Sequence, residues 1–203
     1  MPAHTQEIES KFLVNDLKRI EQRLQALGAV CKVVRSLEYN LRFDDANSRL
    51  KNSHQVLRLR KSDDIRLTYK GPGETRQGAI VRTELELAVD NFDMARSFLE
   101  ALGYQAVVSY EKYRAMYALD GALVTLDELP YGNFVEIEVE KIETIALVAG
   151  KLGLRSEAAI PASYLGLFEH LRTTKGLAAG NLSFEEFKDL EITPADLGVS
   201  PAD

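Results

Sequence analysis

Charged and apolar side chains alternate in the segment Glu-Ile-Glu-Ser-Lys-Phe at residues 7–12, and this pattern restricts how the chain can fold. Successive side chains of a β-strand point to opposite faces, so the segment predicts a strand with Glu7, Glu9 and Lys11 on one face. Two carboxylates one pleat apart repel each other unless positive charge lies between them. We therefore expect this charged face to lie against cations.

The same alternation recurs on six further segments, with charged or polar residues two positions apart. The positions are Arg58 and Arg60; Arg66, Thr68 and Lys70; Arg82, Glu84 and Glu86; Lys112 and Arg114; Thr125 and Asp127; and Glu136 and Glu138. One strand of this kind is most simply the solvated face of an antiparallel sheet. Seven together, nearly all fully charged, favour faces that enclose a common interior. The segment 31–43 contributes less clearly, with Glu38, Asn40 and Arg42.

Alternation and turn signals predict eight strands and four helices. The strands are expected at 7–13, 31–43, 54–61, 65–71, 79–88, 106–119, 122–128 and 133–140, and the helices at 16–27, 91–102, 142–153 and 163–172. Eight strands are enough to close a barrel, which removes exposed edges. We therefore predict an α+β fold, an eight-stranded antiparallel closed β-barrel with helices packed outside and the charged faces lining the lumen.

The charges assigned to this lumen nearly balance, with seven acidic and eight basic side chains. The acidic ones are Glu7, Glu9, Glu84, Glu86, Asp127, Glu136 and Glu138; the basic ones are Lys11, Arg58, Arg60, Arg66, Lys70, Arg82, Lys112 and Arg114. Burying an ion without partners costs on the order of several kcal/mol, so stability alone does not explain such density. A site for a ligand with many anionic oxygens and its metal ions explains it better.

Length and composition limit the remaining possibilities. The 203 residues fit one domain at 1–176 and a C-terminal tail at 177–203 with a short helix near Ser183, frayed from Thr193 onward. A net charge of -6 argues against nucleic-acid binding, and no apolar stretch predicts a membrane span or signal peptide. The single cysteine, Cys31, favours a reducing cytoplasm. We expect a cytoplasmic monomer or homodimer with a small-molecule partner.

The first part of the chain contains an internal sequence repeat, which is called the internal echo below. The first copy consists of a Glu-x-Glu strand, a helical segment ending Leu-Gln-Ala-Leu-Gly at Gly28 and a long strand. The second copy has the same order, with a Glu-x-Glu strand, a segment ending Leu-Glu-Ala-Leu-Gly at Gly103 and another long strand. Such self-similarity usually has an architectural cause, so the echo suggests two related β-α-β halves.

The ordered motifs resemble the CYTH superfamily, the triphosphate tunnel metalloenzymes, over roughly residues 5–172. This family includes class IV adenylyl cyclases, thiamine triphosphatases and inorganic tri- or polyphosphatases. The motifs are Glu7-x-Glu9-x-Lys11, Leu57-Arg58-Leu59-Arg60, Thr68-Tyr69-Lys70-Gly71-Pro72, Arg82-x-Glu84-x-Glu86, Lys112-x-Arg114, Asp127 and Glu136-x-Glu138. One segment departs: where members often carry Asp-x-Tyr-Phe-Asp, this chain has Asn-Leu-Arg-Phe-Asp at 40–44, and Arg42 could add a phosphate contact.

The resemblance implies roles that agree with the chemistry of the side chains. Carboxylates suit Mg²⁺ or Mn²⁺ shared with substrate phosphates, and the expected metal ligands are Glu7, Glu9, Asp127, Glu136 and Glu138. Basic side chains suit the phosphate chain, and the expected substrate-binding residues are Arg58, Arg60, Lys70, Arg82, Lys112 and Arg114. The expected catalytic residues are Lys11, which would position the attacked phosphate or a water, and Glu84 and Glu86, which would assist the nucleophile.

Three functions are compatible with such a tunnel, because phosphoryl transfer is largely positioning and charge stabilisation. Attack by water on the terminal phosphorus would hydrolyse triphosphate, polyphosphate, thiamine triphosphate or a nucleotide. Attack by a ribose hydroxyl on the innermost phosphorus would make an adenylyl cyclase, which also requires a pocket for adenine. A non-catalytic polyphosphate or nucleotide binder would not need so many carboxylates. The sequence favours a metal-dependent triphosphate hydrolase.

Overall fold

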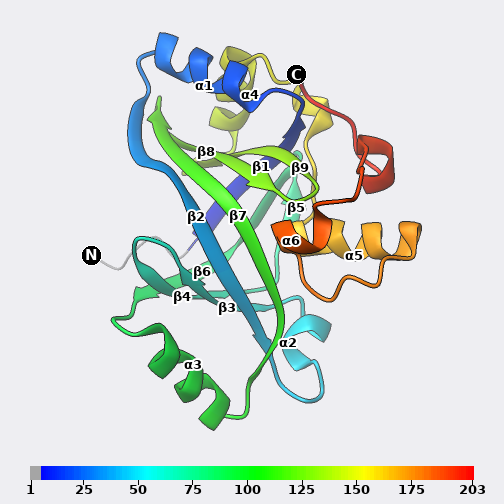
Figure 1. Cartoon of the computed structure of the whole chain (residues 1–203). Coiled ribbons are helices and arrows are strands. Elements are labelled where there is room, and N and C mark those ends of the chain that lie inside the picture. The colour runs from blue at the N-terminus through cyan, green and yellow to red at the C-terminus, as the bar shows by residue number, and fades with distance from the viewer. Residues whose placement is uncertain (1–5) are drawn as a thin grey trace.

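The computed structural model describes residues 6–203 and shows strands wound around a central space with helices on the outside (Figure 1). The strands are β1 (Gln6–Val14), β2 (Val30–Asp44), β3 (Val56–Lys61), β4 (Ile65–Lys70), β5 (Glu74–Arg76), β6 (Ala79–Ala88), β7 (Gln105–Leu119), β8 (Ala122–Leu129) and β9 (Gly132–Val139). The helices are α1 (Leu17–Ala26), α2 (Arg49–Asn52), α3 (Phe92–Ala101), α4 (Glu143–Leu152), α5 (Tyr164–Lys175) and α6 (Phe184–Phe187), with 3₁₀ turns η1 (Ser156–Ala158) and η2 (Pro194–Leu197).

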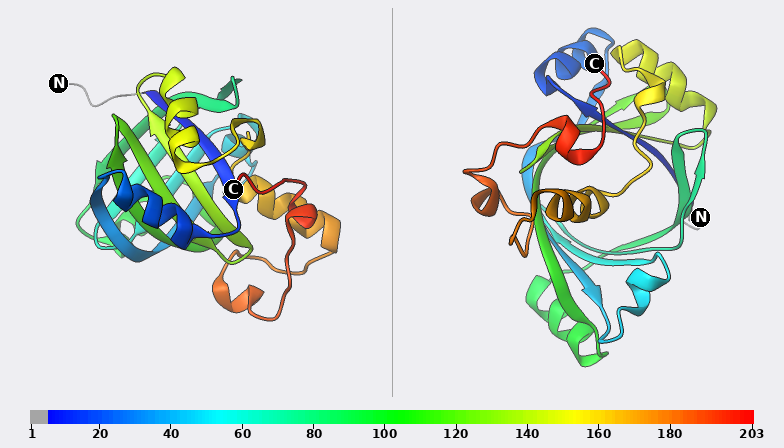
Figure 2. Two further views of the ribbon diagram at one scale, coloured as in Figure 1. Left: turned by 90° about the horizontal axis from the view of Figure 1, so that it is seen from above. Right: turned by 90° about the vertical axis from the view of Figure 1, so that its right-hand side faces the viewer.

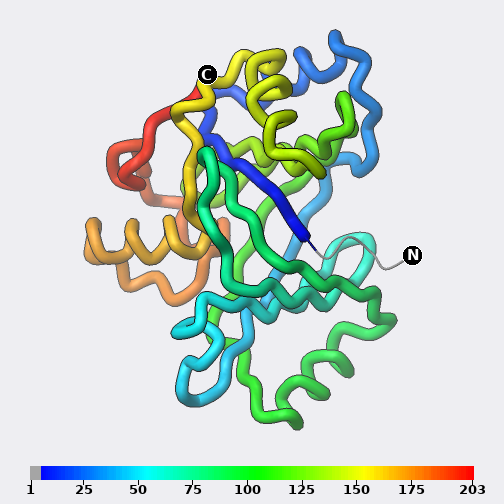
Figure 3. Tube along the Cα trace, turned by 180° about the vertical axis from the view of Figure 1, so that it is seen from behind, coloured from blue at the N-terminus to red at the C-terminus, as the bar shows by residue number. Residues whose placement is uncertain are grey.

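Eight strands form a closed antiparallel ring, as predicted. Their order is β1-β9-β8-β7-β2-β3-β4-β6, and antiparallel pairing of β6 with β1 closes the ring (Figure 3). The ring is uneven, because β1 pairs with only the first half of β6, through Ile80–Thr83. The short strand β5 pairs with the start of β6 and, like α2, carries too few residues for the sequence pattern to predict it.

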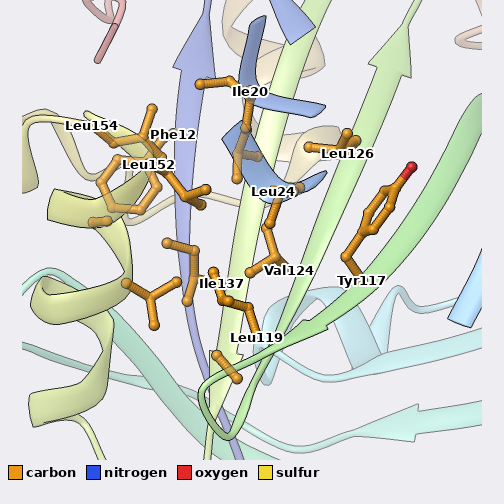
Figure 4. Packing of buried hydrophobic residues seen from close by; sticks show 14 of the residues in the cluster. Phe12, Ile20, Leu24, Tyr117, Leu119, Val124, Leu126, Ile137, Leu152 and Leu154 are labelled. Atoms are coloured by element: carbon orange, nitrogen blue, oxygen red, sulfur yellow. The ribbon is translucent and has the colours of Figure 1, made fainter. Parts of the chain in front are cut away.

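The outward faces of the strands form the apolar core (Figure 4). Phe12, Val124 and Ile137 point away from the lumen and are fully buried against Ile20 and Leu24 of α1 and against α4. Burying one such side chain contributes about 1.5–3 kcal/mol, so the helices hold the strands from outside. A smaller cluster around Leu59 and Leu99 attaches α3 to β2 and β3. The lumen is therefore left to the charged faces, as the sequence predicts.

The internal echo of the sequence corresponds to a repeated arrangement. Strand β1, helix α1 and strand β2 match β6, α3 and β7, and each strand pairs with its counterpart, β1 with β6 and β2 with β7. Both helices end in the same way, because Gly28 and Gly103 adopt left-handed φ angles of 74° and 91°. The long strands β2 and β7 form one bent ribbon through the middle of the molecule (Figure 1).

The C-terminal tail packs against the barrel, and the prediction that it is frayed from Thr193 is wrong. Thr193 and Asp196 form a capping box around η2, which places Leu197 in the apolar cluster beneath α5. The chain then runs to β1, where the N–H of Ala202 donates to the carbonyl of Leu13 at 2.8 Å. The sequence misses this anchoring because the apolar residues of the tail are widely spaced among Gly, Ala and Pro.

Candidate functional site

The ring encloses a cavity of about 520 Å³ whose wall is strongly charged. Figure 2, in its right-hand view, shows the strands curving around this interior, with α5 across one side. The wall contains eight basic side chains, Lys11, Arg42, Arg58, Arg60, Lys70, Arg82, Lys112 and Arg114, and six acidic ones, Glu7, Glu9, Glu84, Glu86, Glu136 and Glu138. Of the fourteen residues predicted to form the site, only Asp127 is not in this wall. We refer to the cavity as the tunnel.

Strand register explains this convergence, because residues two apart on every strand face the same side. On adjacent strands Glu9 lies opposite Glu138, Lys11 opposite Glu136, and Arg42 opposite Arg58. The pairing thus places like charges directly across from each other at Glu9 and Glu138 and at Arg42 and Arg58, and Arg60 likewise lies opposite Arg66. Such pairs destabilise a sheet unless opposite charge lies between them.

One ion-pair network lies on β1, β4 and β6. Glu7 accepts from Lys70 at 2.6 Å and from Arg82 at 2.7 Å, and Arg82 also donates to Glu9 at 3.1 Å. Lys70 lies 3.2 Å from the carboxylate of Glu84 as well. These contacts hold the carboxylates of Glu7 and Glu9 together. Lys70 and Arg82 thus supply the positive charge that two carboxylates one pleat apart were expected to need.

A second network centres on Asp127, which is fully buried behind the tunnel wall. Its carboxylate accepts from Arg114 at 2.7 Å, from Lys112 at 3.1 Å and from the hydroxyl of Tyr164 at 2.7 Å. These contacts use both of its oxygens, so positioning of Lys112 and Arg114 fits Asp127 better than metal ligation. Its predicted metal role stays a prediction.

Glu136 and Lys11 form a buried pair in the same network, 2.9 Å apart. Burial opposes the charged form of Glu136, but Lys11, Arg114 and Lys112 outweigh it and hold its pKa well below the usual range. Burial likewise opposes the charge of Lys11, and Glu136 and Glu9 overcome it and raise the pKa of Lys11. The wall therefore keeps Lys11 positively charged at neutral pH.

A third group of charges lies on β2, β3, β6 and β7. Arg60 donates to Glu38 at 3.0 Å, and Lys112 lies 3.6 Å from the same carboxylate. Burial would raise the pKa of Glu38, but Lys112, Arg114 and Arg60 lower it to about 2. Glu86 lies 3.8 Å from Arg58. Glu38 is the buried acid of the second strand, where the sequence pattern is least clear.

The N-terminal end of α5 lines part of the tunnel through Ser163, Tyr164 and Leu165. The hydroxyl of Ser163 caps the helix, and the Nζ of Lys11 donates to the carbonyl of Ala162 at 3.3 Å. The ring of Tyr164 lies 4.2 Å from the Nζ of Lys11 and 5.2 Å from that of Lys112, measured to its centroid. Sequence reasoning missed Tyr164, because a tyrosine at the start of an amphipathic helix resembles an ordinary core residue.

The tunnel wall contains one carboxylate without a basic partner. Glu138 has no ion pair or hydrogen bond with any residue that the structure describes, and burial together with Glu7, Glu84 and Glu9 raises its pKa to about 7. This excess of negative charge suits a divalent cation bound by oxygen ligands. In residues 6–203, however, no three His, Cys, Asp or Glu side chains are arranged to hold a metal as they stand. A metal would therefore draw Glu7 and Glu9 away from Arg82.

Comparisons with known proteins agree with this geometry. A family model described as the CYTH domain matches residues 5–161. A protein of Methanocaldococcus jannaschii that bears the provisional name of an adenylate cyclase is 24% identical over 134 residues, which are 65% of this chain and 75% of that protein. In residues 6–203 no helix is long and apolar enough to cross a membrane.

Two solved structures share the fold. One, from Vibrio parahaemolyticus and provisionally named an adenylate cyclase, has a TM-score of 0.73 and 20% identity, covering 80% of this chain and 97% of that one. The other, from Hippeastrum, is provisionally named an adenylyl cyclase and described as having a dominant triphosphatase activity. It has a TM-score of 0.62 and 22% identity, covering 80% of this chain and 95% of that one.

Proposed function

Since the chain belongs to the CYTH domain family, we propose that it is a metal-dependent hydrolase of a triphosphate-containing substrate bound in the tunnel. The observation that carries this proposal is the wall itself, where eight basic and six acidic side chains face one cavity. Neither an apolar ligand nor a stable core requires such a wall. A chain of phosphates with a divalent cation matches both signs of charge.

The basic side chains would hold the phosphate chain. Arg58, Arg60 and Arg114 present planar forks that suit two phosphate oxygens at once, whereas Lys70 and Lys112 act as point charges. Lys112 is only 2% exposed and held by Asp127, so its ammonium group is fixed before substrate arrives. Side chains held in place in this way lose little entropy when the ligand binds.

The carboxylates of β1 and β9 would hold the cation. Glu138 forms no ion pair with a basic residue in the described part of the chain, Glu9 lies opposite it across the β1–β9 pair, and Glu7 is two residues before Glu9 on β1. When bound there, Mg²⁺ or Mn²⁺ supplies a Lewis acid that neutralises charge on the phosphate oxygens. Glu84 and Glu86 lie on the neighbouring strand β6, where either carboxylate can accept a proton from a water molecule.

Hydrolysis then requires little beyond positioning. The oxygen of a water molecule forms a bond to the terminal phosphorus, the bridging P–O bond breaks, and the rest of the chain leaves with the electron pair. Lys11, which the wall keeps charged, would stabilise the negative charge that develops in the phosphate chain during this step. Formation of cyclic AMP by the same tunnel is the second candidate, favoured by the names of the relatives. The triphosphatase activity described for the Hippeastrum protein favours hydrolysis.

A panel of substrates tests the proposal. Purified protein with Mg²⁺ or Mn²⁺ receives tripolyphosphate, thiamine triphosphate or ATP, and the products are resolved as orthophosphate, diphosphate and cyclic AMP. We expect orthophosphate; cyclic AMP with an equal amount of diphosphate would establish the cyclase instead. Tight triphosphate binding without turnover would indicate a binder.

Two matched variants complete this test. Glu9→Gln should abolish turnover and leave the circular dichroism spectrum unchanged. Glu128→Gln, which removes a carboxylate paired with Arg35 outside the tunnel, should leave turnover intact. Near-normal activity of Glu9→Gln would refute the assignment of the metal ligands.

A further inference from the structure

Arg42 differs from every other basic residue in the tunnel wall. Each of the other seven has a carboxylate within 4.0 Å, whereas Arg42 has no ion pair with any described residue. Its Nε is buried without a hydrogen-bond partner, and its Nη2 reaches the carbonyl of Gln55 only at 3.5 Å. Asp44, two residues along β2, already accepts three backbone N–H bonds.

The surroundings of Arg42 add positive charge. Arg58 lies directly opposite on β3, and its own Nε is also buried without a partner. Burial, reinforced by Arg58 and Arg82, lowers the pKa of Arg42. The hydroxyl of Tyr110 shares this environment: burial would raise its pKa, but Arg58 and Lys112 lower it. An unpaired guanidinium enclosed by other cations is costly unless an anion enters.

The position of Arg42 along the tunnel indicates in which direction a bound phosphate chain would run. Along β7 the residues facing the tunnel run from Tyr110 through Lys112 and Arg114 to Met116, and the β7 partner of Arg42 is Val108, before Tyr110. Arg42 and Met116 therefore lie toward opposite ends of the tunnel. Met116 and Leu123 supply apolar wall at their end, whereas Arg42 and Arg58 place two guanidinium groups at the other end, next to the apolar side chain of Val56.

We propose that Arg42, with Arg58, binds the terminal phosphate of the substrate, so that the phosphate chain enters with its free end first. This inference rests on the proposed function and specifies the substrate class further. A terminal phosphate carries about -1.5 to -2 charge near neutral pH, more than a phosphate esterified on both sides. Two guanidinium forks match its three free oxygens. The tunnel thereby selects triphosphates with an unesterified end, and any organic group lies toward Met116.

Titration calorimetry in buffer without divalent metal tests the subsite. The first pair of ligands is tripolyphosphate, which has two free ends, and tripolyphosphate methylated on one end phosphate, which has the same length and one free end. The second pair is adenosine triphosphate with its γ-phosphate free or methylated. We expect wild type to bind ATP about tenfold more tightly than its γ-methyl ester. The variant Arg42→Gln should lose that preference, and Arg42→Lys should recover part of it.

The control variant is Arg35→Gln, which removes an arginine that pairs with Glu128 outside the tunnel and should keep the full preference. The thermal midpoint of Arg42→Gln should equal or exceed that of wild type, because the variant removes an unpaired buried charge, so a binding change would not reflect unfolding. Equal preference for the free phosphate in Arg42→Gln and wild type would overturn the subsite while leaving the proposed function intact. Failure of wild type to bind any triphosphate would overturn both.

Discussion

Replacement of Glu138 by Gln should stabilise the metal-free protein at high pH, although it removes a charged residue from the tunnel. Burial and the carboxylates of Glu7, Glu84 and Glu9 raise the pKa of Glu138 from 4.5 to about 7. The folded state therefore binds a proton more tightly than the unfolded chain. Wild type loses stability as the pH rises from about 4.5 to 7, and the full cost remains above that range.

The magnitude follows from the size of this shift. A change of one pKa unit corresponds to about 1.4 kcal/mol, so the full shift would be about 3 kcal/mol. The strands surround Glu138, but its side chain is still open to solvent within the tunnel, and screening by this solvent reduces the effect to about 1 kcal/mol. Glutamine has the same shape and no charge. Glu138→Gln should thus match wild type near pH 4.5 and exceed it by about 1 kcal/mol at pH 8.

Urea unfolding at pH 5 and pH 8, in the presence of a chelator, measures this difference. Glu128→Gln is the matched control, because its carboxylate is paired with Arg35 and its loss should give no gain at pH 8. Addition of Mg²⁺ should favour wild type over Glu138→Gln, since the variant loses a ligand. A variant that is less stable than wild type at pH 8 without metal would refute the argument that burial and the neighbouring carboxylates outweigh the charge of Lys70 at Glu138.

Two further substitutions and a truncation test other parts of the account. Tyr164→Phe removes the hydrogen bond to buried Asp127 and should lower the free energy of unfolding by about 1–3 kcal/mol, measured in urea; an unchanged value would contradict the role of Tyr164. Ile137→Ala should cost about 2–5 kcal/mol in the same assay, and a loss below 1 kcal/mol would show that α1 and α4 do not pack as described. Removal of residues 177–203 uncovers the cluster beneath α5 and should lower the thermal midpoint, whereas an unchanged midpoint would mean that the tail is not anchored.

The fold could be predicted from the sequence because its signal is repeated. The alternation in 7–12 recurs on strand after strand, and each copy places charged side chains on the inner face. An error on one strand would therefore not change the predicted fold. Short elements carry no such signal, and β5, with three residues, was not predicted. The anchoring of Ala202 depends on a backbone contact with Leu13, far along the chain, which no local pattern can reveal.

The sequence predicts which residues face the tunnel, but it does not predict which of them form ion pairs with one another. The period of two shows which side chains share a face, whereas the ion pairs depend on register between strands. The pattern could not reveal that Arg114, Lys112 and Tyr164 donate to the carboxylate of Asp127, whose metal role stays a prediction. The departure at 40–44 draws attention to Arg42, but only the structure shows that Arg42 forms no ion pair with any residue in 6–203 and that its Nε is buried without a partner there. Tyr164 enters from a helix and shares no pattern with the strands.

Anomalous scattering from a crystal grown with Mn²⁺ and tripolyphosphate tests the central claim most directly. The account predicts a manganese peak beside Glu7, Glu9 and Glu138, with the phosphate chain inside the tunnel along Arg58 and one end phosphate at Arg42. Manganese or triphosphate bound only on the outer surface of the barrel, with the ion pairs of the tunnel wall unchanged, would contradict it.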